Sequence, residues 1–172
     1  MDAKKYDRDK LVDLLAERAT FERSAVDLYD ALLDALSDVE DETIASAIEE
    51  LRRHRDEEQD HAEWLEGLLG ELGGKPARGL PDAVHREAGA LEGVIRRKRD
   101  GAGLLPMLHA MLSAELMDYE AWKMLLEIAQ AQGDRAAVRE LRMRVDHEEE
   151  HLALVRRLML TLSKQSVSLH AE

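Results

Sequence analysis

Apolar residues recur at intervals of three and four positions along four long segments of the chain. This spacing places them on one face of an α-helix, so the pattern predicts four amphipathic helices. We expect each helix to bury its apolar face against the others, with a frayed tail after residue 163. The predicted helices cover about residues 7–36, 41–72, 103–132 and 134–162.

The residues at the ends of these segments support the boundaries. Asp41 and Asp134 stand where an N-cap carboxylate can accept hydrogen bonds from the free N–H groups of a first turn. The pair Gly73 and Gly74 is a strong stop signal for the second helix. Pro106 falls in the first turn of the third helix, where a missing N–H costs little.

The lengths of the connections predict how the helices are arranged. Only a few residues join the first helix to the second and the third to the fourth, which favours two antiparallel hairpins. Residues 74–101 form a longer crossover, partly helical in pattern at 82–99, that can return along a helix ~45 Å long. The pattern therefore predicts one all-α domain over residues 1–172, an antiparallel four-helix bundle with a long crossover between helices two and three.

Composition and charge exclude several classes of protein. The chain is 45% hydrophobic with only 3% aromatic residues, and its formal net charge is −13, so neither nucleic acid nor an anionic membrane is an expected partner. It has no cysteine, which excludes disulfides, thiolate zinc sites and cysteine-ligated clusters. No apolar stretch resembles a signal peptide or reaches the ~20 residues of a membrane span. We therefore expect a cytoplasmic protein.

Polar residues interrupt each apolar stripe near its middle. Two of the stripes carry a single Glu, and the other two carry a Glu-x-x-His motif, whose side chains lie on one helix face. The interrupting residues are Glu22 in the first segment, Glu58 and His61 in the second, Glu115 in the third, and Glu148 and His151 in the fourth.

Burying these four carboxylates together requires compensating positive charge. One unpaired buried carboxylate costs several kcal/mol, and like charges repel one another. Arg18 and Arg144 each precede one of the carboxylates by four residues, and together they could offset at most half of the charge. Two divalent cations would neutralise all four carboxylates, and oxygen and imidazole ligands without thiolate suit iron or manganese. The stripes therefore predict a two-metal site.

The spacing of the six residues strengthens this prediction. A single Glu-x-x-His motif is weak evidence, because about one is expected by chance in such a sequence. Here each motif follows a core Glu, at separations of 36 and 33 residues, and Tyr29 and Trp122 each lie seven residues after that Glu. This weak internal repeat is consistent with a site of pseudo-twofold symmetry.

The same segments resemble the two halves of a ferritin-like di-iron carboxylate domain, as in the stand-alone bacterial ferritin-like proteins related to rubrerythrin and bacterioferritin. The resemblance implies that Glu58 and Glu148 bridge two metals, with one further Glu and one His on each. The cysteine-ligated module of rubrerythrins is absent, and no feature establishes the haem or the cage of bacterioferritins. The segments are AERATFERSAVDLYDALL, RDEEQDHAEWLEGLLGELGG, LHAMLSAELMDYEAWKMLLEIA and VDHEEEHLALVRRLM.

Several neighbours of the six residues receive minor roles from the pattern. His54 falls on the inward stripe, where it is either an auxiliary metal or proton-relay position or, as we expect, a polar contact or a partly exposed side chain. We assign no role to His147, while Tyr29 and Trp122 are either core packing or redox-active neighbours.

Glu57 is expected in solvent. Arg18 and Arg144 either partner the ligand carboxylates or, as we expect, reach into solvent. Asp118 either accepts a hydrogen bond from His61 or His151 or, as we expect, lies at the rim.

The resemblance implies a reaction with O₂ or peroxide. The leading interpretation is a protein that holds two Fe ions, with Mn or mixed Fe/Mn as alternatives, and that oxidises Fe²⁺ and/or reduces O₂ or peroxide in iron handling or oxidative-stress defence. Alternatives are iron storage or metal binding without turnover, a structural helical bundle, and an oxygenase of organic substrates. Enzymatic turnover of a ferroxidase or peroxidase type stays open at this point, and a homodimer is expected.

Overall fold

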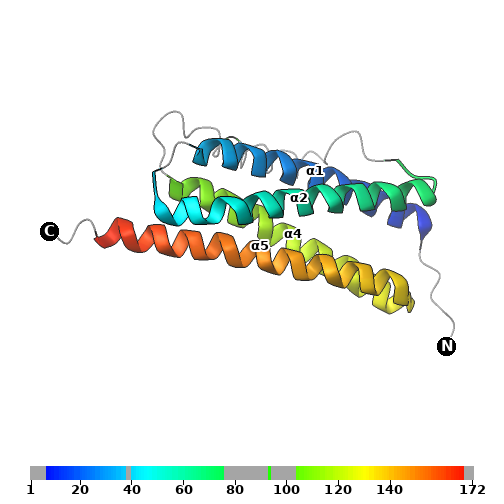
Figure 1. Cartoon of the computed structure of the whole chain (residues 1–172). Helices are drawn as coiled ribbons and strands as arrows, with labels where there is room; N and C mark the ends of the chain where they lie inside the picture. Colours follow the sequence, from blue (N-terminus) through cyan, green and yellow to red (C-terminus); the bar gives the residue numbers. More distant parts are fainter. Residues whose placement is uncertain (1–6, 38–39, 76–92, 94–103, 169–172) are drawn as a thin grey trace.

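A computed structural model describes residues 7–37, 40–75, 93 and 104–168, which form four long helices (Figure 1). The predicted helices are confirmed, and the one clear difference is at the C-terminus. Residues 164–168 contain neither Gly nor Pro, so nothing ends the last helix at residue 162, and the expected fraying there was wrong. The predicted helix at 82–99 lies, apart from residue 93, outside the described residues. The helices are α1 Arg8–Leu36, α2 Glu42–Glu71, α4 Leu104–Gln132 and α5 Arg135–Ser168.

The predicted caps determine where the helices begin and end. Asp41 Oδ1 accepts hydrogen bonds from the backbone N–H groups two and three residues later, at 2.8 and 3.1 Å. Asp134 Oδ1 accepts the same two bonds at 3.1 and 3.0 Å. Gly73 and Gly133, with φ of 69° and 72°, take the left-handed conformation that follows the ends of α2 and α4.

The connectivity is that of two hairpins joined by a crossover (Figure 1). α1 runs antiparallel to α2, and α4 runs antiparallel to α5. α4 begins at the end of the bundle where α2 begins and not at the end where α2 stops, which agrees with the predicted long connection between the two helices. The two hairpins meet through contacts of α2 with α5 and of α1 with α4. No helix in the described ranges combines the length and the apolar character that crossing a membrane would need.

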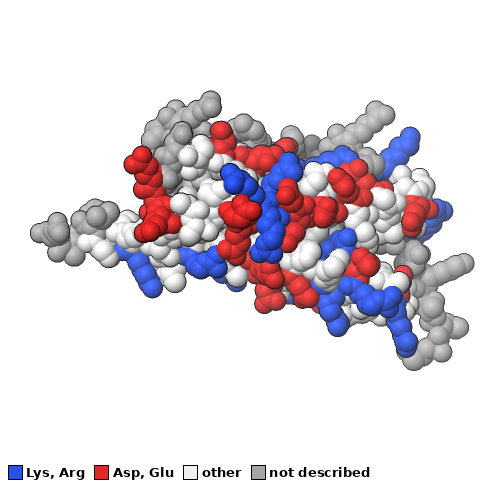
Figure 2. Space-filling model, in the orientation of Figure 1, with Lys and Arg blue, Asp and Glu red and all other residues white. Residues whose placement is uncertain are grey.

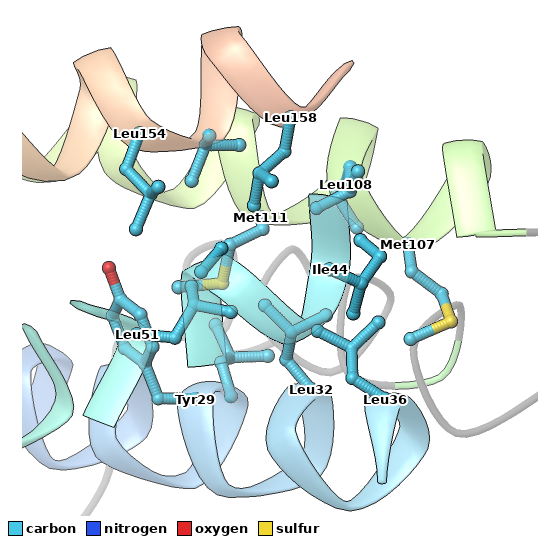
Figure 3. Packing of buried hydrophobic residues seen from close by; sticks show 14 of the residues in the cluster. Tyr29, Leu32, Leu36, Ile44, Leu51, Met107, Leu108, Met111, Leu154 and Leu158 are labelled. Carbon is cyan, nitrogen blue, oxygen red and sulfur yellow. The ribbon is translucent and has the colours of Figure 1, made fainter. Parts of the chain in front are cut away.

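The interior contains two apolar clusters, to which all four helices contribute. The Leu32 cluster lies toward the end where α2 and α4 begin, and Figure 3 shows part of it. The Leu65 cluster lies toward the opposite end. Each buried Leu contributes roughly 1.5–3 kcal/mol to folding by leaving water. Members of the first cluster include Leu32, Leu51, Met111 and Leu158, and members of the second include Leu15, Leu65, Trp122 and Leu141.

Acidic and basic side chains are interspersed on the outer face of α2 and α5 (Figure 2). Ion pairs cross between helices on this surface, including Arg157 with Glu50 at 2.5 Å and Arg55 with Asp30 at 2.9 Å. Such exposed pairs contribute only about 0–1 kcal/mol each. The bundle is therefore held together mainly by its two apolar clusters.

Candidate metal centre

A layer of buried polar residues separates the two clusters, and it contains all six residues that interrupt the apolar stripes. Their ligand atoms form two groups, each within 4.8 Å, and Glu58 and Glu148 belong to both. Every side chain in the two groups is at most 2% exposed. We call Glu22 and His61 the Glu22 half of the centre, and Glu115 and His151 the Glu115 half.

Both histidines turn the same ring atom toward the carboxylates. His61 Nδ1 lies 3.1 Å from Glu148 Oε1, and His151 Nδ1 lies 3.1 Å from Glu58 Oε1. Each motif histidine therefore reaches the Glu carboxylate of the opposite motif, across the contact between α2 and α5. The i, i+3 spacing makes this geometry possible, because it puts both side chains of a motif on the helix face that meets the other helix.

The atoms that point into the layer are short of hydrogen-bond partners. An unpaired buried polar atom costs about 1–3 kcal/mol, so a group of them indicates that something else normally binds there. Carboxylate oxygens and imidazole nitrogens, all converging, suit divalent cations such as iron or manganese. His61 Nδ1 and Glu148 Oε1 face each other at 3.1 Å as a charged contact, but neither forms a hydrogen bond. The atoms of the six residues without a hydrogen bond are Glu22 Oε2, Glu58 Oε2, His61 Nδ1, Glu115 Oε2 and both carboxylate oxygens of Glu148.

The pKa values of Glu115 and His61 are both raised, so both groups favour the protonated form in the metal-free layer. Burial raises the pKa of Glu115 to about 7. Burial alone would lower the pKa of His61, but its contacts with Glu148, Glu22 and Glu58 outweigh this effect and raise the pKa to about 11. A protonated imidazole thus supplies part of the positive charge in the metal-free protein, and bound cations would supply it in its place.

Arg18 and Asp118 are buried beside the Glu22 half, so the expectation that they lie in solvent and at the rim was wrong. The alternative, that Arg18 partners a carboxylate of the layer, agrees with the structure. Arg18 is 7% exposed and Asp118 is 1% exposed. Arg18 Nε donates to Glu22 Oε1 at 2.6 Å, and another guanidinium nitrogen donates to Asp118 Oδ1 at 2.5 Å. Desolvation is tolerated because the guanidinium pairs with two carboxylates. Arg18 and Asp118 are 100 residues apart in sequence, so no local sequence pattern could predict their contact.

Arg144 is also buried, at 6% exposure, rather than reaching into solvent as expected. Its guanidinium lies 4.0 Å from the centre of the Trp64 ring and donates to the backbone oxygen of Glu140 at 2.9 Å. Stacking on an aromatic face is favourable for a weakly hydrated guanidinium. Arg144 therefore packs next to the centre without bonding one of the six residues.

The outer nitrogen of each layer histidine has its own partner. His151 Nε2 lies 2.9 Å from Glu57 Oε2, and Arg53 donates to Glu57 at 3.2 Å. His61 Nε2 lies 3.2 Å from His147 Nδ1. Glu57 was expected in solvent and His147 was given no role, and both expectations were wrong. A usable signal existed, because each residue directly precedes the Glu of a Glu-x-x-His motif.

His54 is fully buried, which corrects the expected partial exposure. Its ring centre lies 4.2 Å from that of His151, and burial lowers its pKa to about 3, so it is neutral. With Glu57 and His151 it forms a third cluster of potential ligand atoms. Arg53 contacts both Glu57 and His54 Nε2, the latter at 3.3 Å, so a cation in this cluster would meet a guanidinium.

The aromatic pair Tyr29 and Trp122 borders the layer on its two sides, and both side chains are fully buried. The Tyr29 ring centre lies 6.0 Å from that of His151, and the Trp122 ring centre lies 5.2 Å from that of His61. Burial and the nearby Glu115 carboxylate raise the pKa of Tyr29 well above its usual value. Figure 3 shows the Tyr29 hydroxyl directed away from α1. Both residues therefore pack as core, whatever further role they have.

Comparison with known protein families agrees with this geometry. The family model for ferritin, described as a ferritin-like domain, matches residues 12–164. The chain belongs to the ferritin-like family. The match covers the crossover and all six residues of the layer, and the buried Glu/His cluster is of the kind that binds metal ions in ferritin-like di-iron sites. Curated proteins offer no match to the chain.

Proposed function

We propose that this ferritin-like protein holds two iron ions and uses them to oxidise Fe²⁺ and/or to reduce O₂ or peroxide, in iron handling or oxidative-stress defence. The observation that carries the proposal is the pair of overlapping ligand groups that share Glu58 and Glu148. Two cations that share two carboxylates lie close enough to act on one small molecule.

Each of the six residues has a role in this proposal. Glu58 and Glu148 would bridge the two ions, because only they belong to both groups. The Glu22 half would complete the shell of one ion, and the Glu115 half would complete that of the other. When bound, two Fe²⁺ ions supply one electron each, enough with two protons to reduce one H₂O₂ to two waters.

The rest of the chain controls the surroundings of the centre. The Leu32 and Leu65 clusters close both ends of the layer with apolar side chains and keep bulk water away from it. Glu57 and His147 hold the rings of His151 and His61 from outside, so that Nδ1 of each faces inward. A dry, prearranged set of ligands of this kind strengthens electrostatic interactions with bound cations.

The test is anaerobic titration with Fe²⁺, followed by addition of O₂ or H₂O₂ with optical detection of the oxidised centre. We expect two Fe²⁺ per chain in the wild type and loss of binding in Glu58→Ala and Glu148→Ala. Glu149→Ala is a matched control, because Glu149 is the exposed neighbour of Glu148. Absence of stoichiometric iron, or wild-type binding by both bridging variants, contradicts the proposal. Light scattering tests the predicted homodimer and distinguishes it from a cage, which iron storage requires.

A further inference from the structure

We propose that the two metal positions are inequivalent, and that the position in the Glu115 half binds a divalent cation more tightly and fills first because Glu57 supports His151. The inference rests on the proposed function, since it concerns the same centre. It adds an order of filling and names the positioning residue that sets this order.

The internal repeat identifies two equivalent supporting positions. Residues 57 and 147 are 90 residues apart, as are the bridging pair 58 and 148 and the histidine pair 61 and 151. In the structure, each supporting residue contacts the outer nitrogen of the layer histidine on the opposite motif. The same structural position therefore holds a carboxylate behind His151 and an imidazole behind His61.

This difference changes how well each histidine can bind a metal. A neutral histidine that binds through Nδ1 must carry its proton on Nε2. The Glu57 carboxylate, which is paired with Arg53, can only accept a hydrogen bond, so it holds His151 in that tautomer and increases the basicity of Nδ1. His147 can donate or accept, so it holds His61 in that tautomer only when its own Nδ1 is unprotonated. It also carries no negative charge, so it does not increase the basicity of His61 Nδ1 as a carboxylate does.

The two carboxylates that each belong to one half only, Glu22 and Glu115, also differ in a way that favours metal binding in the Glu115 half. Glu22 Oε1 accepts a hydrogen bond from Arg18 at 2.6 Å, which leaves Oε2 as the atom free to bind a cation. Asp118 offsets part of the Arg18 charge, but the bond to Glu22 remains. No Lys or Arg within the described residues pairs with Glu115. A cation in the Glu22 half must therefore share its carboxylate with a guanidinium, whereas a cation in the Glu115 half does not.

The experiment uses Mn²⁺ alone as the probe, with calorimetric titration of the full chain and anomalous scattering from crystals at one equivalent. In the wild type we expect two binding steps, with about tenfold or greater preference for the Glu115 half at one equivalent. Glu57→Gln keeps the shape and removes the charge, so it should weaken the first step by about 10–100-fold. The matched variant His147→Gln should affect only the second step.

An exchange variant gives the strongest test of the role of Glu57. Glu57→His combined with His147→Glu moves the carboxylate behind His61, and we expect the preference to weaken or reverse. Equal filling in the wild type, or first filling of the Glu22 half, overturns the inference while leaving the two-metal centre intact. So does an equal loss in both steps for Glu57→Gln, which would indicate a general structural role. If no Mn²⁺ binds, this inference fails, and the Fe²⁺ titration described above decides separately whether the two-metal centre stands.

Discussion

The α1–α2 and α4–α5 hairpins provide the same ligands in the same order, yet they surround them differently. Each hairpin places one Glu on its first helix and a Glu-x-x-His motif on its second. Around the Glu22 half lie two buried arginines, Arg18 and Arg144, whereas Tyr29 and the neutral His54 lie beside His151. The six inner residues thus follow the internal repeat, whereas the residues around them differ between the two hairpins. This difference can give two similar metal positions different properties.

The largest expected effect comes from the residues that the two halves share. Glu58→Ala should reduce bound iron from two ions per chain to nearly none, because Glu58 belongs to both ligand groups. Glu22→Ala and Glu115→Ala should each leave about one ion, because each removes a ligand from one half only. Elemental analysis after anaerobic loading and desalting measures the ratio. Equal losses in all three variants would show that the halves do not act as separate positions.

The next effect is on the stability of the metal-free protein. Arg18→Met imitates the repeat-equivalent residue of α4, Met111, and leaves Glu22 and Asp118 buried without their guanidinium. Loss of one partner of a buried ion pair costs about 3–5 kcal/mol in free energy of unfolding. Urea unfolding in chelator measures this cost. The double variant Arg18→Met with Asp118→Leu should recover part of it, and a single variant as stable as the wild type would show that the Arg18 pairs do not hold the Glu22 half together.

Metal binding should stabilise the folded protein, and the size of this stabilisation should depend on which half of the centre is intact. A ligand at 100 times its Kd adds about 2.7 kcal/mol per site to the free energy of unfolding. We therefore expect the Tm to rise with added Mn²⁺ and to fall back with chelator, and the rise should be smaller in Glu115→Ala than in Glu22→Ala. A Tm that ignores metal would support a purely structural bundle instead.

A smaller effect is expected from pH, through His54. Burial, followed by the charge of His151, lowers the pKa of His54 to about 3, so only the unfolded chain takes up this proton between about pH 6.5 and pH 3. The free energy of unfolding of the metal-free protein should therefore fall as the pH falls through this window. At pH 5 the uptake of this proton by the unfolded chain lowers the free energy of unfolding by about 2 kcal/mol. His54→Leu should remove this pH-dependent loss. Equal pH slopes for the two proteins in chelator would contradict a neutral, buried His54.

The smallest effect concerns the aromatic pair that borders the two halves. The Tyr29 hydroxyl is buried without a hydrogen-bond partner, so Tyr29→Phe should leave the free energy of unfolding of the metal-free protein unchanged or raise it by about 1 kcal/mol. Trp122→Phe removes ring volume from the Leu65 cluster and should cost more. Urea unfolding compares the two variants. A large loss in Tyr29→Phe would mean that the hydroxyl has a structural bond after all.

Most of the fold and the inner ligands could be predicted because helical periodicity is a local property. Glu22 and Glu115 fall on apolar stripes at intervals of three and four residues, and this alone requires them to be buried once the bundle forms. The outer partners could not be predicted in the same way. Glu57 and His147 stand one position away from the stripe, where a residue lies either in the helix–helix contact or in solvent depending on how far the helices rotate.

The chain alone thus determined the four helices, their antiparallel pairing and the six residues of the layer, since each follows from spacing, caps and connection lengths. Only the tertiary structure decided that Arg18 is buried against Glu22 and Asp118, and that a carboxylate supports His151 where an imidazole supports His61. The physical reason is that helix packing brings together side chains 86, 94 and 100 residues apart in sequence, and the charge balance of the buried layer depends on these contacts.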